Sequence, residues 1–196
     1  MRKSKLVSLM LLIVILAMSL TACGQKASDD DTIKIGYVGA LSGETAVWGQ
    51  AGLNGMELTA KEINEAGGIL GKQVEIIGLD GRGDPTDSVN AFRRLATEEE
   101  VIAVIGTNFS SCNIAMAPIA DQLEVPLIAT AASNPKVTVD EDGNLHPYSF
   151  RIGFIDPFQG QVLANLASDE LGATKAGIIY DIGSDYSTGL AQYFEE

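Results

Sequence analysis

The chain has 196 residues, of which 13 are basic and 26 acidic, and its formal net charge at pH 7 is −13. A chain this acidic lacks the basic surface with which proteins bind nucleic acid, so we expect no nucleic-acid partner. With two cysteines and one histidine, the sequence also lacks the residues for a disulfide framework or a zinc cluster.

The first residues have the layout of a secretory signal. The opening MRKSK is basic, and the apolar run that follows over residues 6–20 is too short for a comfortable transmembrane helix. The run ends in the small-residue sequence LTAC. We therefore expect a signal peptide over residues 1–22 and an extracytoplasmic location for the mature protein.

The sequence LTAC resembles the bacterial lipoprotein box, in which the cysteine becomes the acylated first residue of the mature protein. This resemblance implies lipidation of Cys23 and attachment to the membrane through the lipid. The next residues, 23–31, are polar and acidic and have no periodicity. Such a composition is typical of a flexible tether.

From residue 32 onward, apolar runs typical of buried strands alternate with segments of helical periodicity. Strands are predicted over residues 32–41, 73–80, 101–107 and 125–130, and helices over residues 47–68, 84–100 and 111–124. Pro118 is expected to interrupt the last of these helices. This alternation predicts an α/β fold with a parallel sheet and helices on both faces.

The alternation breaks at an irregular stretch rich in turn residues and restarts near Ile152. An extended run over residues 148–152, a helix from residue 156 and a buried strand over residues 175–181 are predicted. The last twelve residues begin a helical pattern that stops without a capping signal at its end. We therefore expect a first lobe over residues 32–151 and an incomplete second lobe over residues 152–196, in a fragment of a longer protein.

The ends of the four predicted strands are rich in small and polar residues, in the sequences GALSG, DGRGD, GTNFSSCN and ATAASNP. In an open parallel sheet, ligands bind beyond the carboxyl ends of the strands. Ser110 and Ser111 also stand where a strand leads into a helix, whose free N–H groups favour a carboxylate. The alternative is that both serines cap this helix.

No enzyme motif is present. The glycines after the first strand do not have the spacing of a dinucleotide site, and a nucleophile elbow is absent. Cys112 is expected to be a buried, unreactive thiol, His146 lies in the irregular stretch, and the carboxylates of DGRGD are expected to serve the loop and a helix cap. We expect no catalytic residue, no metal and no cofactor.

Three long stretches resemble a known family. Residues 33–85, 101–135 and 151–166 are similar to the type I periplasmic binding proteins of the branched-chain amino acid class, which are solute receptors of ABC importers. The resemblance implies two lobes, each a Rossmann-like parallel sheet with helices on both faces, that close over the ligand by a hinge motion.

The same resemblance implies a set of ligand-binding residues: an aromatic side chain beside the ligand's side chain, a serine site for its carboxylate, backbone and hydroxyl groups after the fourth strand, and a tyrosine from the second lobe. The implied residues are Trp48, Ser110, Ser111, Ala131, Ser133 and Tyr186.

Two departures from the family pattern affect these expectations. Members with a first-lobe disulfide carry cysteines where this chain has Gly83 and Phe109, so no such disulfide is expected. The acidic residue expected to hold the ligand's ammonium group would lie beyond Glu196.

The resulting prediction is a lipid-anchored solute-binding protein that captures a branched-chain or other aliphatic amino acid and passes it to an ABC transporter permease. The alternative is a ligand-sensing receptor domain of the same fold, for an amide, urea or small organic acid, that is not part of a transporter.

The lipoprotein prediction can be tested at Cys23. Replacing Cys23 with Ala removes the only thiol in the box, so the variant should be released from the membrane or remain as an unprocessed precursor. Cell fractionation followed by mass spectrometry of the mature N-terminus measures both outcomes. An unmodified Cys23 in the mature wild-type protein would contradict the prediction, because the protein would then lack the acyl chains that a stable anchor needs.

Overall fold

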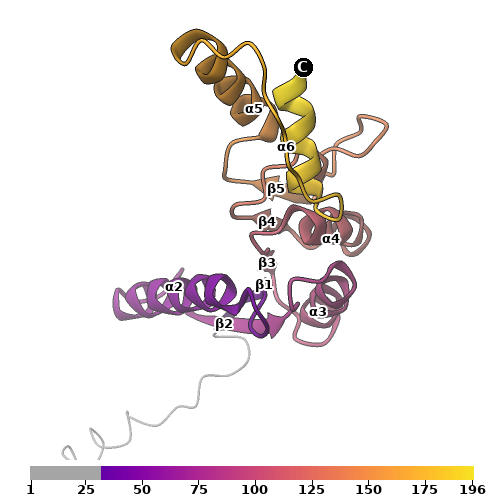
Figure 1. The fold of residues 1–196 in the computed structure, drawn as a ribbon. Helices are drawn as coiled ribbons and strands as arrows, with labels where there is room; N and C mark the ends of the chain where they lie inside the picture. The colour runs from indigo at the N-terminus through magenta and orange to yellow at the C-terminus, as the bar shows by residue number, and fades with distance from the viewer. Residues whose placement is uncertain (1–31) are drawn as a thin grey trace, which may run out of the picture. The chain divides into compact units, whose positions relative to one another are not determined.

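Five strands form one sheet. The computed structural model describes residues 32–196. The strands are β1 (Thr32–Gly39), β2 (Gln73–Asp80), β3 (Ala103–Ile105), β4 (Leu127–Ala129) and β5 (Ser149–Arg151). Their order in the sheet is β2-β1-β3-β4-β5, and the β1–β3, β3–β4 and β4–β5 pairs are parallel (Figure 1). The carboxyl ends of these four parallel strands therefore share one edge of the sheet.

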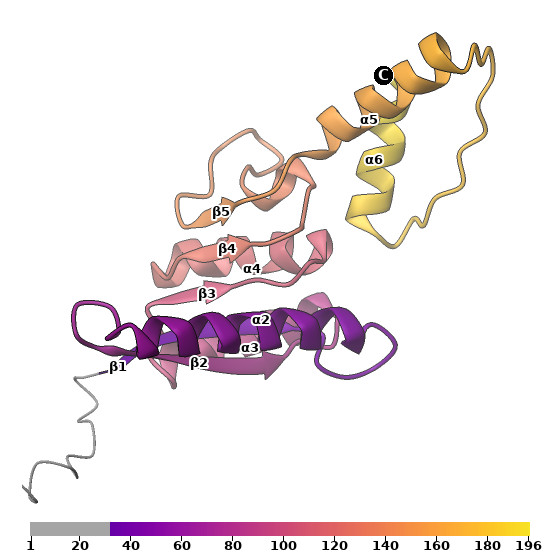
Figure 2. The same ribbon diagram turned by 90° about the vertical axis from the view of Figure 1, so that its left-hand side faces the viewer.

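Helices cover both faces of this sheet, which confirms the predicted fold class. The α-helices are α2 (Ala46–Glu65), α3 (Pro85–Thr97), α4 (Ser110–Leu123), α5 (Asp156–Asn165) and α6 (Asp185–Glu195). Two short helices, η2 (Pro135–Val137) and η3 (Leu166–Glu170), follow β4 and α5. Helix α2 lies on one face of the sheet, and α3 and α4 lie together on the other (Figures 1 and 2).

The main core lies between the sheet and the α3–α4 pair. Val104 in β3 is paired in register with Gly36 and Leu127 on the neighbouring strands. Val104 and Leu127 are fully buried, and so are Phe92 and Leu95 of α3. At about 25 cal/mol per Å² of apolar surface, burial of such side chains supplies most of the free energy that holds α3 and α4 on the sheet.

Glycines allow α2 to approach the end of β1 closely. The hydroxyl of Tyr37 donates a hydrogen bond to the carbonyl oxygen of Gly49, with an O···O distance of 3.0 Å. A Cβ atom on Gly49 would overlap the carbonyl oxygen of Ala40, and one on Gly52 would overlap the Tyr37 hydroxyl. By contrast, a Cβ on Gly55, in the same helix, would meet no atom within 4 Å. Only the first two glycines are therefore required by packing.

The two helices after β2 and β3 begin differently. In α3 the N-cap Asp84 accepts a hydrogen bond from the backbone N–H of Asp87 at 2.9 Å, with Pro85 at the first turn, as the sequence predicted. In α4 the N-cap is Phe109, and no side chain caps the helix. The expected interruption at Pro118 was wrong: α4 is continuous from Ser110 to Leu123, and Pro118 is accommodated at an exposed position.

The predicted strand over residues 175–181 was also wrong. These residues are irregular and exposed, and the side chain of Ile179 is fully accessible. Within residues 32–196 no strand lies beside them, so their backbone groups cannot form the hydrogen bonds of a sheet. The predicted extended run over residues 148–152 instead supplies β5, the fifth strand of the sheet.

The predicted helix at residues 185–196 is confirmed as α6. Its N-cap is Ser184, whose side chain accepts from the N–H of Ser187. Helix α6 packs on α5 at Gly160, where a Cβ atom would lie 2.6 Å from the backbone carbonyl of Tyr193. The absence of a side chain at Gly160 lets the two helices touch.

The signal peptide, Cys23 and the tether over residues 23–31 lie outside the described residues. Within residues 32–196, no helix combines the length and apolar composition that a membrane crossing requires. The lobe boundary near Ile152 stays a prediction.

The glycine contacts of α2 lead to a matched pair of substitutions. Gly49→Ala should destabilise the protein by about 1–3 kcal/mol, since the new methyl group forces α2 away from β1. Gly55→Ala should be neutral or stabilise it by up to about 1 kcal/mol, through better helix propensity alone. Urea unfolding at constant m-value measures both free energies. Equal effects at the two positions would show that α2 does not dock as described.

Candidate functional site: a cleft at the strand ends

A cleft of about 540 Å³ lies at the carboxyl ends of the parallel strands. Its walls come from the first turn of α2, the loops after β2, β3, β4 and β5, and the first turns of α4, α5 and α6. The lining residues are Trp48, Gly83, Pro85, Asn108, Phe109, Ser110, Ser111, Ala131, Ser133, Phe154, Gln159, Gly183, Ser184 and Tyr186. The volume suits a small molecule.

All six residues that the sequence implied as ligand contacts line this one cleft. They lie up to 138 positions apart in the chain, between Trp48 and Tyr186. The structure therefore brings them together, while their roles toward a ligand stay predictions.

Several residues that line the cleft were not expected from the sequence. Phe154 and Gln159 belong to the stretch RIGFIDPFQG, which carried the family resemblance, but no role was assigned to them. Phe109 was noted only as a position where some relatives have a cysteine; its ring lies beside Gly83, 3.6 Å from where a Cβ there would be. Asn108 lacked any signal beyond its place in a polar strand end.

The serines at the start of α4 do not cap that helix, so the capping alternative was wrong. Ser110, which is 2% exposed, accepts a hydrogen bond at its Oγ from the backbone N–H of Asn134, at 3.3 Å. Ser111 accepts one at its Oγ from the backbone N–H of Asp185, at 3.1 Å. Each hydroxyl therefore joins α4 to another wall of the cleft.

These two bonds also decide what the serines can offer to a ligand. A hydroxyl has one proton to donate and lone pairs to accept with. Because Ser110 and Ser111 already accept from backbone N–H groups, their protons remain available for an acceptor in the cleft. The first N–H groups of α4, which no side chain caps, add donors and a partial positive charge at the same place. This end of the cleft favours a carboxylate or another anionic acceptor.

Asn134 fixes the geometry around Ser133. Its side-chain Nδ2 donates to the backbone oxygen of Asp185 at 2.7 Å. Its own carbonyl oxygen accepts from Nη1 of Arg151 at 2.8 Å. Since Asn134 is almost fully buried, these bonds hold the loop after β4 against both β5 and the start of α6.

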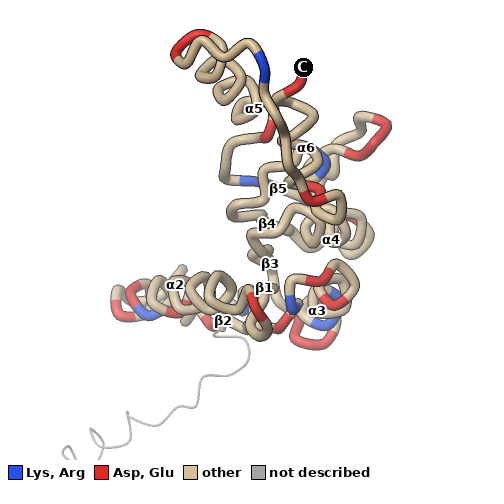
Figure 3. Tube along the Cα trace, in the orientation of Figure 1, with Lys and Arg blue, Asp and Glu red and all other residues tan. Residues whose placement is uncertain are grey.

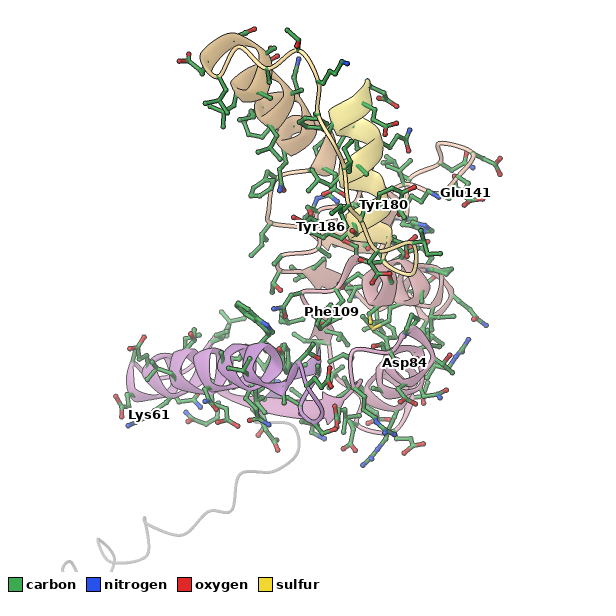
Figure 4. All side chains as sticks on the ribbon, viewed as in Figure 1. Lys61, Asp84, Phe109, Glu141, Tyr180 and Tyr186 are labelled. Carbon is green, nitrogen blue, oxygen red and sulfur yellow. The ribbon has the colours of Figure 1, made fainter. Side chains whose placement is uncertain are left out.

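Aromatic rings form the open part of the cleft. The side chains of Trp48 and Phe154 are 62% and 60% exposed, which is unusual for such large apolar groups. Tyr186, in the first turn of α6, accepts a hydrogen bond at its hydroxyl from Nε2 of Gln159 at 3.1 Å. Figure 4 labels Tyr186 and Phe109, which belong to the starts of different helices. The rings offer an apolar surface to the less polar part of a ligand.

Among residues 32–196, no charged side chain lines the cleft, although a fifth of the residues in the chain are charged. Lysine, arginine, aspartate and glutamate are spread over the elements around it (Figure 3). A charged group of the ligand would therefore be held within residues 32–196 by N–H dipoles and hydroxyls rather than by an ion pair.

One acidic side chain lies directly behind the cleft. Asp156, the first residue of α5, is fully buried, and its backbone N–H donates to the carbonyl oxygen of Ser133 at 3.0 Å. Burial raises the pKa of the Asp156 carboxyl, while the nearby Ser133 hydroxyl and the Arg151 guanidinium act in the opposite direction. Neither makes a hydrogen bond to the carboxyl oxygens in this structure.

The remaining candidates for chemistry have structural roles. Cys112 is buried, and burial raises the pKa of its thiol, as expected for an unreactive cysteine. Nδ1 of His146 lies 2.6 Å from Oδ2 of Asp121. Asp80 accepts from the backbone N–H groups of Leu41 and Arg82, which confirms its expected loop role. Within residues 32–196, no three His, Cys, Asp or Glu side chains gather closely enough to hold a metal ion.

An α/β sheet whose strand ends open into an uncharged cleft of hydroxyls, helix N–H groups and aromatic rings defines a small-molecule binding protein. Residues 32–196 match the family model described as periplasmic binding protein. The chain therefore belongs to the periplasmic binding protein family, and it is similar to the branched-chain amino acid binding proteins, as its sequence predicted. This family is not enzymatic.

Named relatives agree with this assignment. The chain is 30% identical over 175 residues to the leucine-specific-binding protein of Salmonella typhimurium, covering 89% of this chain and 46% of that protein. The structure resembles the branched-chain amino acid substrate-binding protein LivJ of Streptococcus pneumoniae in complex with isoleucine, with a TM-score of 0.75, 36% identity, and coverage of 84% and 46%. It also resembles the leucine-binding protein LivK of Thermotoga maritima, with a TM-score of 0.73, 34% identity, and coverage of 83% and 44%. The chain thus spans less than half the length of these relatives.

The buried Asp156 predicts a pH dependence of stability. Because its pKa is raised in the folded protein, the folded protein binds the proton more tightly than the unfolded chain does. Its contribution to stability is therefore fully present below pH 3.8, the ordinary value, and is lost as pH rises through the raised pKa.

Asp156→Asn should remove this dependence. The variant should be more stable than the wild type at pH 7, and the difference should shrink as pH falls through the raised pKa toward 3.8 and stay constant below that value. Urea unfolding at a series of pH values measures the difference. A variant less stable than the wild type at pH 7 would contradict the prediction, because it would show that neighbouring groups stabilise the charged carboxylate in the folded protein.

Proposed function

We propose that this protein captures a branched-chain or other aliphatic amino acid outside the cytoplasm and delivers it to the permease of an ABC importer. The observation that carries the proposal is the orientation of Ser110 and Ser111, whose protons are free to donate into the cleft that all six implied contact residues line. The printed names of the relatives, which bind leucine, isoleucine or valine, support this ligand class.

In this proposal the two ends of the ligand meet different surfaces. Its carboxylate accepts from Ser110, Ser111 and the first N–H groups of α4. Its ammonium group lies by Ala131 and Ser133, at the end of β4. Its apolar side chain packs against the rings of Trp48 and Tyr186, where burial of each methylene adds about 0.8 kcal/mol.

Two further parts of the proposal concern the architecture and the location. We infer a first lobe over residues 32–151 and a second lobe beginning at residue 152, which would close over the ligand. The relatives extend well beyond the matched part, which supports a second lobe. The lipoprotein box at Cys23 supports a lipid anchor on the outer side of the cytoplasmic membrane. No observation favours the alternative of a ligand-sensing receptor domain.

A thermal-shift screen of the purified protein tests the ligand class. Ligands that bind only the folded protein raise its apparent melting temperature. L-leucine, L-isoleucine and L-valine should raise it, whereas urea, acetamide and 4-hydroxybenzoate should not. A shift with one of the last three and none with the amino acids would contradict the proposal.

Two serine substitutions test the binding mode. Ser110→Ala and Ser133→Ala should each weaken the binding of L-leucine by about 1–3 kcal/mol, because each leaves a charged group of the ligand without a partner. Ser168→Ala, on the exposed helix η3, is the matched control and should bind as the wild type does. Isothermal titration calorimetry measures the three affinities. If all three variants bind like the wild type, the hydroxyls of the cleft do not hold the ligand.

A further inference from the structure

Asp156 is an acidic side chain whose burial is not compensated by hydrogen bonds. It is fully buried, and both of its carboxyl oxygens lack a hydrogen-bond partner within residues 32–196. A buried carboxylate without partners costs several kcal/mol, so an isosteric asparagine would be the cheaper residue at this position. A cost of this kind is often found where a residue serves function rather than stability.

Asp156 lies between helix α6 and the loop after β4, and that loop also lines the cleft. Helix α6 closes one side, where a Cβ atom on Gly189 would lie 3.1 Å from Oδ2 of Asp156. Nη1 of Arg151, on β5, is bonded to the carbonyl oxygen of Asn134. On the side of the cleft lies Ser133, whose carbonyl oxygen accepts from the N–H of Asp156 and which lines the cleft.

A carboxylate can only accept hydrogen bonds, so it constrains the direction of its neighbour's hydroxyl. When the Ser133 hydroxyl donates its proton to Asp156, the lone pairs of the Ser133 oxygen remain to accept a hydrogen bond from a ligand in the cleft. This is the opposite of Ser110 and Ser111, each of which already accepts from one backbone N–H group and keeps its proton to donate.

We propose that Asp156 is a positioning residue whose carboxyl, without a partner in this structure, accepts the proton of the Ser133 hydroxyl once that side chain turns toward it, with or without ligand, so that Ser133 presents an oxygen lone pair to an N–H donor of the ligand. This inference rests on the proposed function and deepens it. The cleft is then sorted by hydrogen-bond polarity: Ser110 and Ser111 donate to an acceptor group, and Ser133 accepts from a donor group. Such a cleft selects an α-amino acid over a simple carboxylic acid of the same shape.

A double-mutant cycle with two probes tests this selection. The proteins are the wild type, Asp156→Asn, Ser133→Ala and the double variant, and the probes are L-leucine and 4-methylpentanoate, its analogue without the amino group. Asp156→Asn should weaken L-leucine binding about tenfold, because a neutral amide is a weaker acceptor and can also turn its N–H groups toward Ser133. It should leave 4-methylpentanoate binding within about twofold, and it should add no loss in the Ser133→Ala background.

The control variant is Asp169→Asn, which removes the same charge from an exposed position on η3 and should change neither affinity. Calorimetric titration at pH 7 gives all the affinities. Equal losses for the two probes on Asp156→Asn, or losses that add in the double variant, would show a structural role for Asp156 and overturn the inference.

A second readout separates this inference from the proposed function. Without any ligand, urea unfolding of the same four proteins at pH 7 gives the coupling between the two positions. Asp156→Asn should stabilise the Ser133→Ala background more than the wild type, since the hydroxyl there no longer compensates the carboxylate. If neither probe binds the wild type but this coupling is present, the proposed function fails and the pairing of Ser133 with Asp156 stands. A coupling of zero overturns the pairing whether or not ligand binds.

Discussion

The arrangement of the cleft depends on the hydrogen bonds of one buried residue, Asn134. Its backbone N–H reaches Ser110 on α4, its side chain reaches the backbone of Asp185 at the start of α6, and its carbonyl oxygen receives Arg151 from β5. These segments are far apart in sequence. A directional set of bonds from a single residue joins them, which places the loop after β4 to within hydrogen-bond tolerance.

The parallel sheet explains why these segments meet at all. Parallel strands require a crossover connection between each pair, so every strand ends at the same edge and every helix begins there. At that edge the first N–H groups of the helices have no partner in the backbone. Such groups could not stay unpaired inside a closed core, but in a cleft they can bind a ligand. An uncharged cleft rich in donors follows from this topology, and the short residues at the strand ends keep it open. One unfavourable feature accompanies this arrangement: the carboxyl of Asp156 is buried behind the cleft, and its oxygens have no hydrogen-bond partner within residues 32–196.

Much of the fold could be predicted because the deciding patterns are local. The periodicity of α2 and α3, the cap at Asp84 and the parallel sheet all follow from residues close in sequence. The errors arose where the deciding contact is distant. Residues 175–181 have the composition of a strand but no neighbour to pair with, and Pro118 is tolerated because its side of α4 faces solvent. The six implied site residues do share one cleft, yet the buried carboxyl of Asp156 gave no sequence signal, since its role depends on where Ser133 and Gly189 lie in space.

Trp48 is the only tryptophan in the chain, and it stands half in solvent at the rim of the cleft. Its indole emission therefore comes from one place in the molecule, without a background from the core. An indole in water emits at longer wavelength than one covered by an apolar surface, so any process that covers this rim shifts the whole tryptophan spectrum of the protein. The molecule carries its own optical reporter, at the position where the cleft meets solvent, and no dye or added label is needed to follow that site in real time.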